Sequence, residues 1–146
     1  MKQDEIIRIG RDRYLAENSF GVESYRATGF PIFIGKWTFF VPNPGKLPLH
    51  DLHHVVSGYG TGLIGEAEIS AYELRGGGCS FFIFILCIGA IFFGMFIAPK
   101  RIRQAWRRAE GTKTLYNFNV SYEDLLEMKV GELRRQLGIP SSGMRR

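Results

Sequence analysis

The chain has 146 residues, about one domain's worth, and it is 45% apolar, 14% aromatic and 23% charged, which excludes a mainly disordered protein. Its net charge of +5 is uneven: residues 1–75 sum to −1, residues 76–98 carry no charge, and residues 99–146 sum to +6. Two cysteines are too few for a disulfide scaffold, and the first residues lack the apolar core of a signal peptide, so we expect no cleaved secretion.

The N-terminal half predicts three helices around an aromatic segment. Residues 3–17 favour a short amphipathic helix. Residues 29–44, GFPIFIGKWTFFVPNP, are interrupted by proline and glycine and are consistent with either a short strand pair or an extended arm against a membrane. A helix is expected from Leu47 to just before Gly58, and a second over residues 62–75, running antiparallel to the first after a short turn.

The longest uncharged stretch is residues 79–98, CSFFIFILCIGAIFFGMFIA, which contains six phenylalanines. As a helix, twenty residues extend roughly 30 Å, the thickness of a bilayer core. Gly89 and Gly94 are possible break points that favour shallow insertion, and a membrane-spanning helix is the alternative. We therefore predict a membrane-associated segment here.

A basic cluster follows directly and favours binding to anionic lipid head groups, because it adjoins the apolar stretch. Its members are Lys100, Arg101, Arg103, Arg107 and Arg108. The same charges would suit nucleic acid, but the apolar neighbour makes lipid the expected partner. If residues 79–98 spanned the membrane, the positive-inside rule would place residues 99–146 in the cytoplasm.

The C-terminal region predicts two more helices, over residues 100–110 and 121–137, the second capped by Ser121. The expected fold is therefore mainly α: a single helical domain over residues 1–146 with one long apolar membrane-associated helix and basic C-terminal helices in 100–146.

All three histidines lie within five residues. At 100° per residue, His50, His54 and Asp51 share one sector of the first central helix, whereas His53 borders its apolar stripe. On the second central helix, Glu66 lies beside an apolar stripe, where a carboxylate needs a compensating cation. Two imidazoles and two carboxylates would suit Zn²⁺, Mn²⁺ or Fe²⁺. The alternative is an ordinary solvated polar helix face.

Other chemistry has no support in the sequence. Neither cysteine is near the histidines, and no nucleophile elbow, phosphate loop or dinucleotide fingerprint is present.

The pattern His50-Asp51-x-x-His54, followed by eleven residues and Glu66, resembles the signature of the coenzyme Q biosynthesis protein four family. Gly58 and Gly65 lie at the family's intervals. The segment Leu-Arg-Arg-Gln-Leu-Gly-Ile over residues 133–139 is also similar to the family's C-terminal helix, and the resemblance covers residues 36–139 approximately.

This resemblance implies metal ligation by His50, Asp51, His54 and Glu66, with zinc the expected divalent ion. It also implies ubiquinone biosynthesis, with decarboxylation and hydroxylation at C1 of a polyprenyl hydroxybenzoate. The alternative is a non-catalytic lipid-binding organiser with a structural metal. A third interpretation is a small bitopic membrane protein with an incidental histidine cluster.

The expected partners are membrane lipids, a polyprenyl-tailed quinone precursor, other ubiquinone-biosynthesis proteins and a second copy of the chain, but not nucleic acid. Phe84 and Ile88, four residues apart on one helix face, are the predicted tail-binding residues. If the chain is bacterial, we expect it at the cytoplasmic face of the inner membrane.

Overall fold

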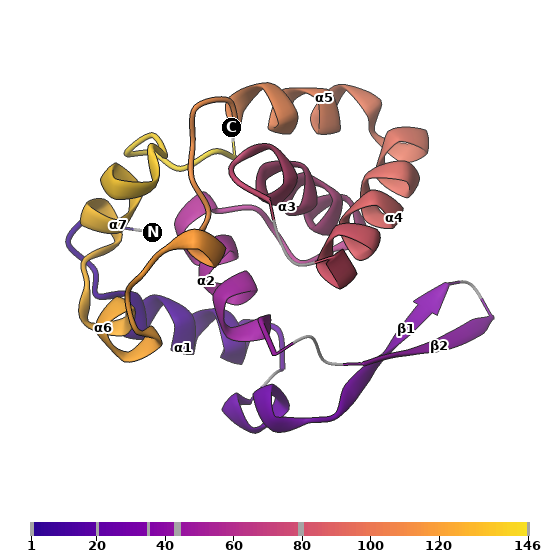
Figure 1. Ribbon diagram of the computed structural model, residues 1–146, viewed down its shortest axis with the longest axis horizontal. Coiled ribbons are helices and arrows are strands. Elements are labelled where there is room, and N and C mark those ends of the chain that lie inside the picture. Colours follow the sequence, from indigo (N-terminus) through magenta and orange to yellow (C-terminus); the bar gives the residue numbers. More distant parts are fainter. Residues whose placement is uncertain (1, 20, 35, 43–44, 79–80, 146) are drawn as a thin grey trace.

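Helices dominate the computed structural model, which describes residues 2–19, 21–34, 36–42, 45–78 and 81–145 (Figure 1). Within these ranges there are seven α-helices, two short 3₁₀ helices and one two-stranded ribbon. The mainly α prediction is confirmed.

Two helices, α2 (Leu47–Ser57) and α3 (Leu63–Arg75), lie near the middle of the molecule (Figure 1). Helices α1 (Ile7–Glu17) and α7 (Val130–Leu137) pack against α2. The buried core includes Leu52, Val55, Val56, Ile69, Tyr72, Leu115, Leu125, Leu126 and Leu133. The core therefore encloses the two helices that carry the histidine and glutamate motif.

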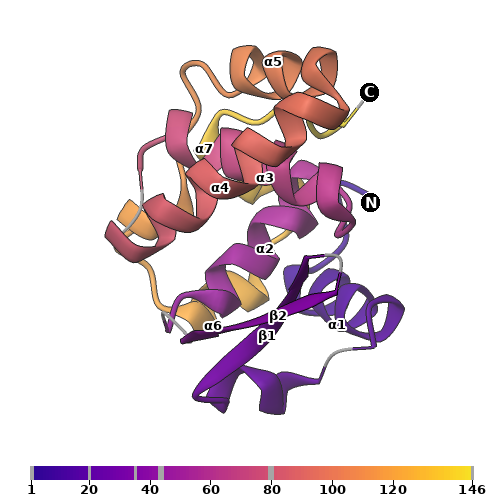
Figure 2. The ribbon, with the colours of Figure 1, turned by 90° about the vertical axis from the view of Figure 1, so that its right-hand side faces the viewer.

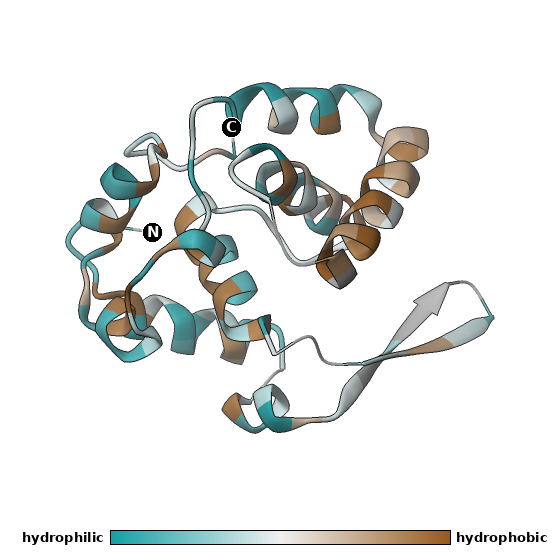
Figure 3. Cartoon of the chain, in the orientation of Figure 1, coloured by the Kyte–Doolittle hydropathy of each residue, from teal (hydrophilic) through white to brown (hydrophobic). Residues whose placement is uncertain are grey.

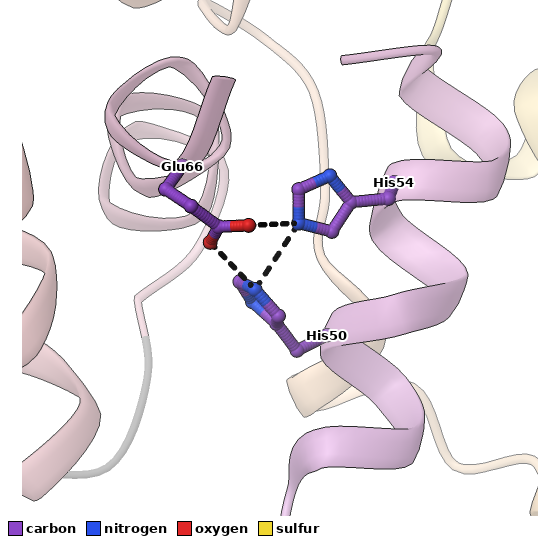
Figure 4. Close-up of side chains that lie close together, drawn as sticks. All are labelled: His50, His54 and Glu66. Atoms are coloured by element: carbon purple, nitrogen blue, oxygen red, sulfur yellow. Dashed lines mark hydrogen bonds and ion pairs between the residues drawn. The ribbon is translucent and has the colours of Figure 1, made fainter. Parts of the chain in front are cut away.

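Both central helices form where the sequence predicts them, but they do not run antiparallel. Figures 2 and 4 show α3 crossing α2 steeply. A Cβ added at Gly65, in the first turn of α3, would lie 2.0 Å from the carbonyl oxygen of Gly60. Glycine at residue 65 thus lets the start of α3 press against the connecting loop, which brings Glu66 close to α2.

The apolar stretch forms α4 (Phe81–Ile97), a continuous helix of 17 residues, about 25 Å long. No helix in the described part of the chain is long and apolar enough to cross a membrane. The alternative prediction, a membrane-spanning helix over residues 79–98, is therefore wrong. Cys79 lies outside the described residues, and α4 ends before Pro99, where α5 (Pro99–Arg108) begins in a new direction (Figure 1).

One side of α4 is packed and the other is exposed. Ile83 and Cys87 are buried, and a Cβ added at Gly94 would lie 2.4 Å from that of Ala67 on α3. Gly94 is thus a packing position rather than a break. Figure 3 shows α4 mostly in the brown tones of hydrophobic residues. The large exposed side chains of α4 are Phe81, Phe84, Ile85, Ile88, Phe92, Phe93, Phe96 and Ile97.

The prediction of a single C-terminal helix over residues 121–137 is wrong, because the structure divides this segment into α6 (Tyr122–Glu127) and α7. At the break, the N-terminal segment supplies the hydrogen bonds that a helix would have made. The Ile7 N–H donates to the Met128 carbonyl, and the Val130 N–H donates to the Glu5 carbonyl. The predicted cap is confirmed, since the Ser121 hydroxyl accepts from the Asp124 N–H.

The aromatic segment forms an antiparallel strand pair, β1 (Gly29–Ile34) and β2 (Trp37–Pro42), with Ile34 paired to Trp37 beside the turn. This ribbon projects from the helices (Figure 1). Short 3₁₀ helices precede it at Val22–Arg26 and occur later at Leu115–Asn117.

Candidate metal centre

Three predicted ligands converge between α2 and α3 (Figure 4). His50 Nε2 and His54 Nε2 are 3.2 Å apart. The two Glu66 carboxylate oxygens lie 3.3 Å from these nitrogens, one oxygen for each histidine. The i, i+4 spacing of the histidines and the first-turn position of Glu66 on a crossing helix produce this group.

The other nitrogen of each imidazole, Nδ1, forms a hydrogen bond with an acceptor. His54 Nδ1 lies 3.2 Å from the Tyr59 carbonyl oxygen, and His50 Nδ1 lies 2.8 Å from a Glu73 carboxylate oxygen. Both acceptors require an N–H, so a neutral imidazole carries its proton on Nδ1 and presents a lone pair at Nε2. Two such lone pairs and the Glu66 carboxylate meet at one point, which demands a proton or a metal cation.

The distances also fit a metal ion. Two nitrogens bound to one tetrahedral zinc, at about 2.0–2.1 Å each, would lie about 3.3 Å apart. The three separations among His50, His54 and Glu66 are 3.2, 3.3 and 3.3 Å. His/His/Glu is also a donor set with room for a further ligand, so the group can hold a metal ion.

The electrostatics show that the group attracts a cation, which is either a proton on His50 or a metal ion. Burial opposes protonation of His50, but Glu73 and Glu66 outweigh it and raise the pKa of His50 well above its ordinary value. Burial would also raise the pKa of Glu66, but hydrogen bonds to His50 and His54 lower it to about 2. The carboxylate is therefore negative and the site attracts positive charge.

Glu73 is a residue that the sequence analysis missed. Its side chain is fully buried, and one oxygen accepts from His50 Nδ1, from His53 Nδ1 at 2.7 Å and from the Tyr116 hydroxyl at 2.8 Å. Burial would raise the pKa of Glu73, but the two histidines lower it. Glu73 follows Glu66 by seven residues, two turns along the same helix face, and that spacing is the signal that could have identified it.

His53, which was expected to border the apolar stripe, and Glu68, two residues after Glu66, do not join the group. His53 is buried, and its Nε2 accepts from the Leu115 N–H at 2.8 Å, so both of its nitrogens are occupied. Burial lowers its pKa, consistent with a neutral ring. Glu68 instead forms a two-pronged ion pair with Arg101, at 2.6 and 2.9 Å.

Asp51, the fourth predicted ligand, lies beside the group rather than in it. Its carboxylate accepts from the Tyr25 hydroxyl at 2.7 Å and from the Tyr14 hydroxyl at 3.3 Å. Burial raises the pKa of Asp51, partly offset by these hydroxyls and the histidines. The Tyr14 ring in turn stacks on His54, with ring centroids 5.4 Å apart. Asp51 thereby holds two tyrosines against the metal-binding side of α2.

Two open hollows adjoin the site. One, of about 400 Å³, is lined by His54, Tyr14, Tyr59 and two arginines, Arg13 and Arg145, among others. The other, of about 360 Å³, is lined by Leu63, Ile64, Ile97 and Arg101, among others. They share Gly60 and Arg145 as lining residues, and His54 lines only the first of them.

The remaining predicted residues lie on α4 and α5. Phe84 and Ile88 are exposed on one side of α4 and line neither hollow. Lys100, Arg103 and Arg107 are exposed on α5. Two of the predicted surface cations also bind within the protein: Arg101 pairs with Glu68, and Arg108 donates to the Met144 carbonyl.

Residues 48–142 match the family model described as "Coenzyme Q (ubiquinone) biosynthesis protein Coq4". No curated protein and no solved structure matches the chain. The match covers more than half of the 146 residues and includes the whole histidine and glutamate motif, which confirms the resemblance found in the sequence. The chain therefore belongs to the Coq4 family of ubiquinone-biosynthesis proteins.

Proposed function

We propose that this chain, as a single helical domain over residues 1–146, binds a divalent metal, expected to be zinc, and acts on a polyprenyl hydroxybenzoate. The observation that carries the proposal is the meeting of His50 Nε2, His54 Nε2 and the Glu66 carboxylate at 3.2–3.3 Å. In this proposal Asp51 completes or orients the ligand set from the neighbouring position. A cation held there would polarise a bound carboxylate or phenolate and stabilise developing negative charge.

The chain's own groups suit a ligand with an anionic head and an apolar tail. Arg145 and Tyr14 border the hollow at His54, together with Glu17 and with Arg13, which pairs with Glu5. In this proposal Arg145 pairs with a carboxylate beside the metal group. Loss of CO₂ breaks the bond between C1 and the carboxyl carbon and leaves the electron pair on the ring. Replacing the carboxyl by hydroxyl also removes two electrons, which requires an oxidant of the dioxygen class.

The second candidate is a non-catalytic organiser that presents the lipid intermediate to other ubiquinone-biosynthesis proteins, and it is favoured by the extensive exposed apolar side of α4. A structural metal has a closed shell of protein ligands, whereas a catalytic metal keeps an exchangeable water. Both sites are four-coordinate, so the exchangeable water separates the two candidates: azide, which replaces such a water, should change the absorption spectrum of the cobalt-substituted protein only if the site is catalytic.

The decisive test combines metal analysis with quinone content in cells that carry wild type or His54→Ala. Loss of both metal and ubiquinone is the expected result. Normal ubiquinone in cells whose variant binds no metal would refute the metal-dependent function.

The tail-binding role of Phe84 and Ile88 gives a further expected result. Replacing both with Asn should weaken binding of a polyprenyl-tailed ligand in detergent by about tenfold or more, because amides cannot be satisfied by a hydrocarbon chain. Metal content should not change. The matched variant is Leu63→Asn/Ile97→Asn, in the hollow of about 360 Å³. If only this second variant loses affinity, the tail lies in the hollow instead.

Membrane association without crossing is also part of the proposal, through the exposed side of α4 and the basic α5. Residues 17 and 142 then lie on the same side of the membrane, which is the cytoplasmic side if the chain is bacterial. In a background lacking Cys79 and Cys87, we expect Glu17→Cys and Ser142→Cys to react from the same side of sealed vesicles. Reaction from opposite sides would refute this arrangement. Self-association should appear as a concentration-dependent mass in light scattering.

A further inference from the structure

The ribbon of β1 and β2 projects from the helical part of the protein. It has only two strands and extends away from the helices (Figures 1 and 2). A two-stranded hairpin is marginally stable in water unless another surface packs against it. It lies before residue 48, where the family match begins.

The exposed side chains of this ribbon are unusually apolar. Trp37, Phe39 and Phe40 have exposed fractions of 64%, 51% and 66%. In residues 29–42, Lys36 is the only charged residue and Thr38 the only other polar one. Exposed aromatic side chains grouped in this way indicate a surface that binds an apolar phase.

The position of the ribbon indicates what covers it. The ribbon and α4 both lie on the side of the molecule that faces the viewer in Figure 2. Neither residues 29–42 nor residues 76–109 contain a single acidic residue, and the exposed Lys100, Arg103 and Arg107 follow α4. A flat anionic bilayer can cover two separate apolar elements at once, and its charge complements these cations.

We propose that the ribbon over residues 29–42 lies in the boundary between head groups and acyl chains of an anionic membrane, as a second contact beside α4. The proposal rests on the membrane association included in the proposed function. Trp and Lys are the residue types that favour this boundary. The Lys36 ammonium lies 5.9 Å from the centre of the Trp37 ring, so the ring can enter the lipid while the ammonium reaches a phosphate.

A second contact with the membrane would fix the orientation of the protein on the bilayer. A protein bound through α4 alone can rotate about that helix, whereas contacts through two elements define one face. Pro42, at the end of β2, is only five residues before Leu47, where the histidine-bearing helix α2 begins. The ribbon thus links the membrane surface directly to the helix that carries His50 and His54.

Trp37 is a natural reporter, because the chain has only one other tryptophan, Trp106. In the Trp106→Phe full chain, we expect vesicles with 30% anionic phospholipid to shift Trp37 emission to the blue. Lipids brominated near the carbonyl end of the acyl chain should quench it more strongly than lipids brominated near the terminal methyl. Unshifted, unquenched emission while the protein is bound to vesicles overturns the proposal and leaves contact by α4 standing.

Sedimentation with the same vesicles gives an independent measure. Trp37→Ser/Phe40→Ser should lower the partition coefficient about tenfold or more, because two large aromatic side chains leave the lipid. The matched control is Ile9→Ser/Val120→Ser, which removes two exposed apolar side chains from other elements and should have little effect. Equal losses in the two variants, or no vesicle binding by wild type, overturn the proposal. Metal content reports separately on the proposed function.

A second copy of the chain is the competing occupant of the ribbon. If the ribbon joined two copies, Trp37→Ser/Phe40→Ser would halve the mass measured by light scattering in the absence of lipid. That result would overturn the membrane proposal. We expect the mass to be the same for wild type and variant.

Discussion

Glu66→Gln is expected to reduce zinc affinity by more than the roughly 10–100-fold that loss of an outer-shell partner costs. The substitution removes the negative charge that faces both Nε2 atoms at 3.3 Å while leaving the side-chain volume nearly unchanged. His54→Ala should cause a loss of similar size, because it removes one of the two nitrogen ligands. Competition with a chromophoric chelator measures both affinities.

Glu68→Gln is the matched control, two residues along the same helix. Its carboxylate pairs with Arg101 and faces away from the histidines, so zinc affinity should stay within about threefold of wild type. His53→Ala should also retain zinc in the fraction that folds. An equal loss of affinity in Glu66→Gln and Glu68→Gln would contradict the proposed ligand set.

Glu73→Leu is expected to destabilise the metal-free protein by about 3–5 kcal/mol, because the substitution removes a buried carboxylate and leaves its partners unpaired. His50, His53 and Tyr116 would all lose their shared acceptor at 2.7–2.8 Å. Urea denaturation followed by circular dichroism measures the free energy of unfolding. Glu132→Leu, at an exposed position on α7, should change it by only about 0.5 kcal/mol.

Glu73→Gln separates the effect on stability from the effect on the metal. The amide oxygen can still accept one hydrogen bond, but it no longer provides a negative partner for His50 Nδ1–H. We therefore expect a smaller loss of stability than in Glu73→Leu, together with a 10–100-fold loss of zinc affinity, approximately. Unchanged zinc affinity would mean that Glu73 does not orient His50.

Much of the metal centre was predictable because helical periodicity is local. The i, i+4 spacing of His50 and His54 and the first-turn position of Glu66 need only 100° per residue. By the same rule Glu73 lies on the Glu66 face of α3. It was not predicted, because burying an acid is normally costly and the histidines that pair with Glu73 lie on another helix, α2. The steep crossing of α2 and α3 depends on the close approach at Gly65, which is tertiary information.

The helix boundaries show the same difference: an end that nearby residues determine was predictable, and an end that distant residues determine was not. The start of α6 was predictable from the Ser121 cap, which acts within three residues. The break between α6 and α7 was not, because the backbone of residues 3–7 causes it from more than a hundred positions away. The apolar stretch was predicted as one long helix, but packing of Ile83, Cys87 and Gly94 makes one side of α4 part of the protein core.

The pairing of residues 3–7 with residues 128–131 has a consequence for the order of folding. In addition to the Ile7 and Val130 bonds, the Gly131 N–H donates to the Gln3 carbonyl, so residues 3–7 find these partners only after residues 128–131 have been synthesised. Contacts between residues so far apart in the sequence slow folding, because the entropy of loop closure is lost before the contacts form. α7 also holds α2, because the buried Arg134 donates to the Val56 carbonyl at 2.7 Å. During translation, the histidine-bearing helix therefore acquires this support only after residues 130–137 have been synthesised.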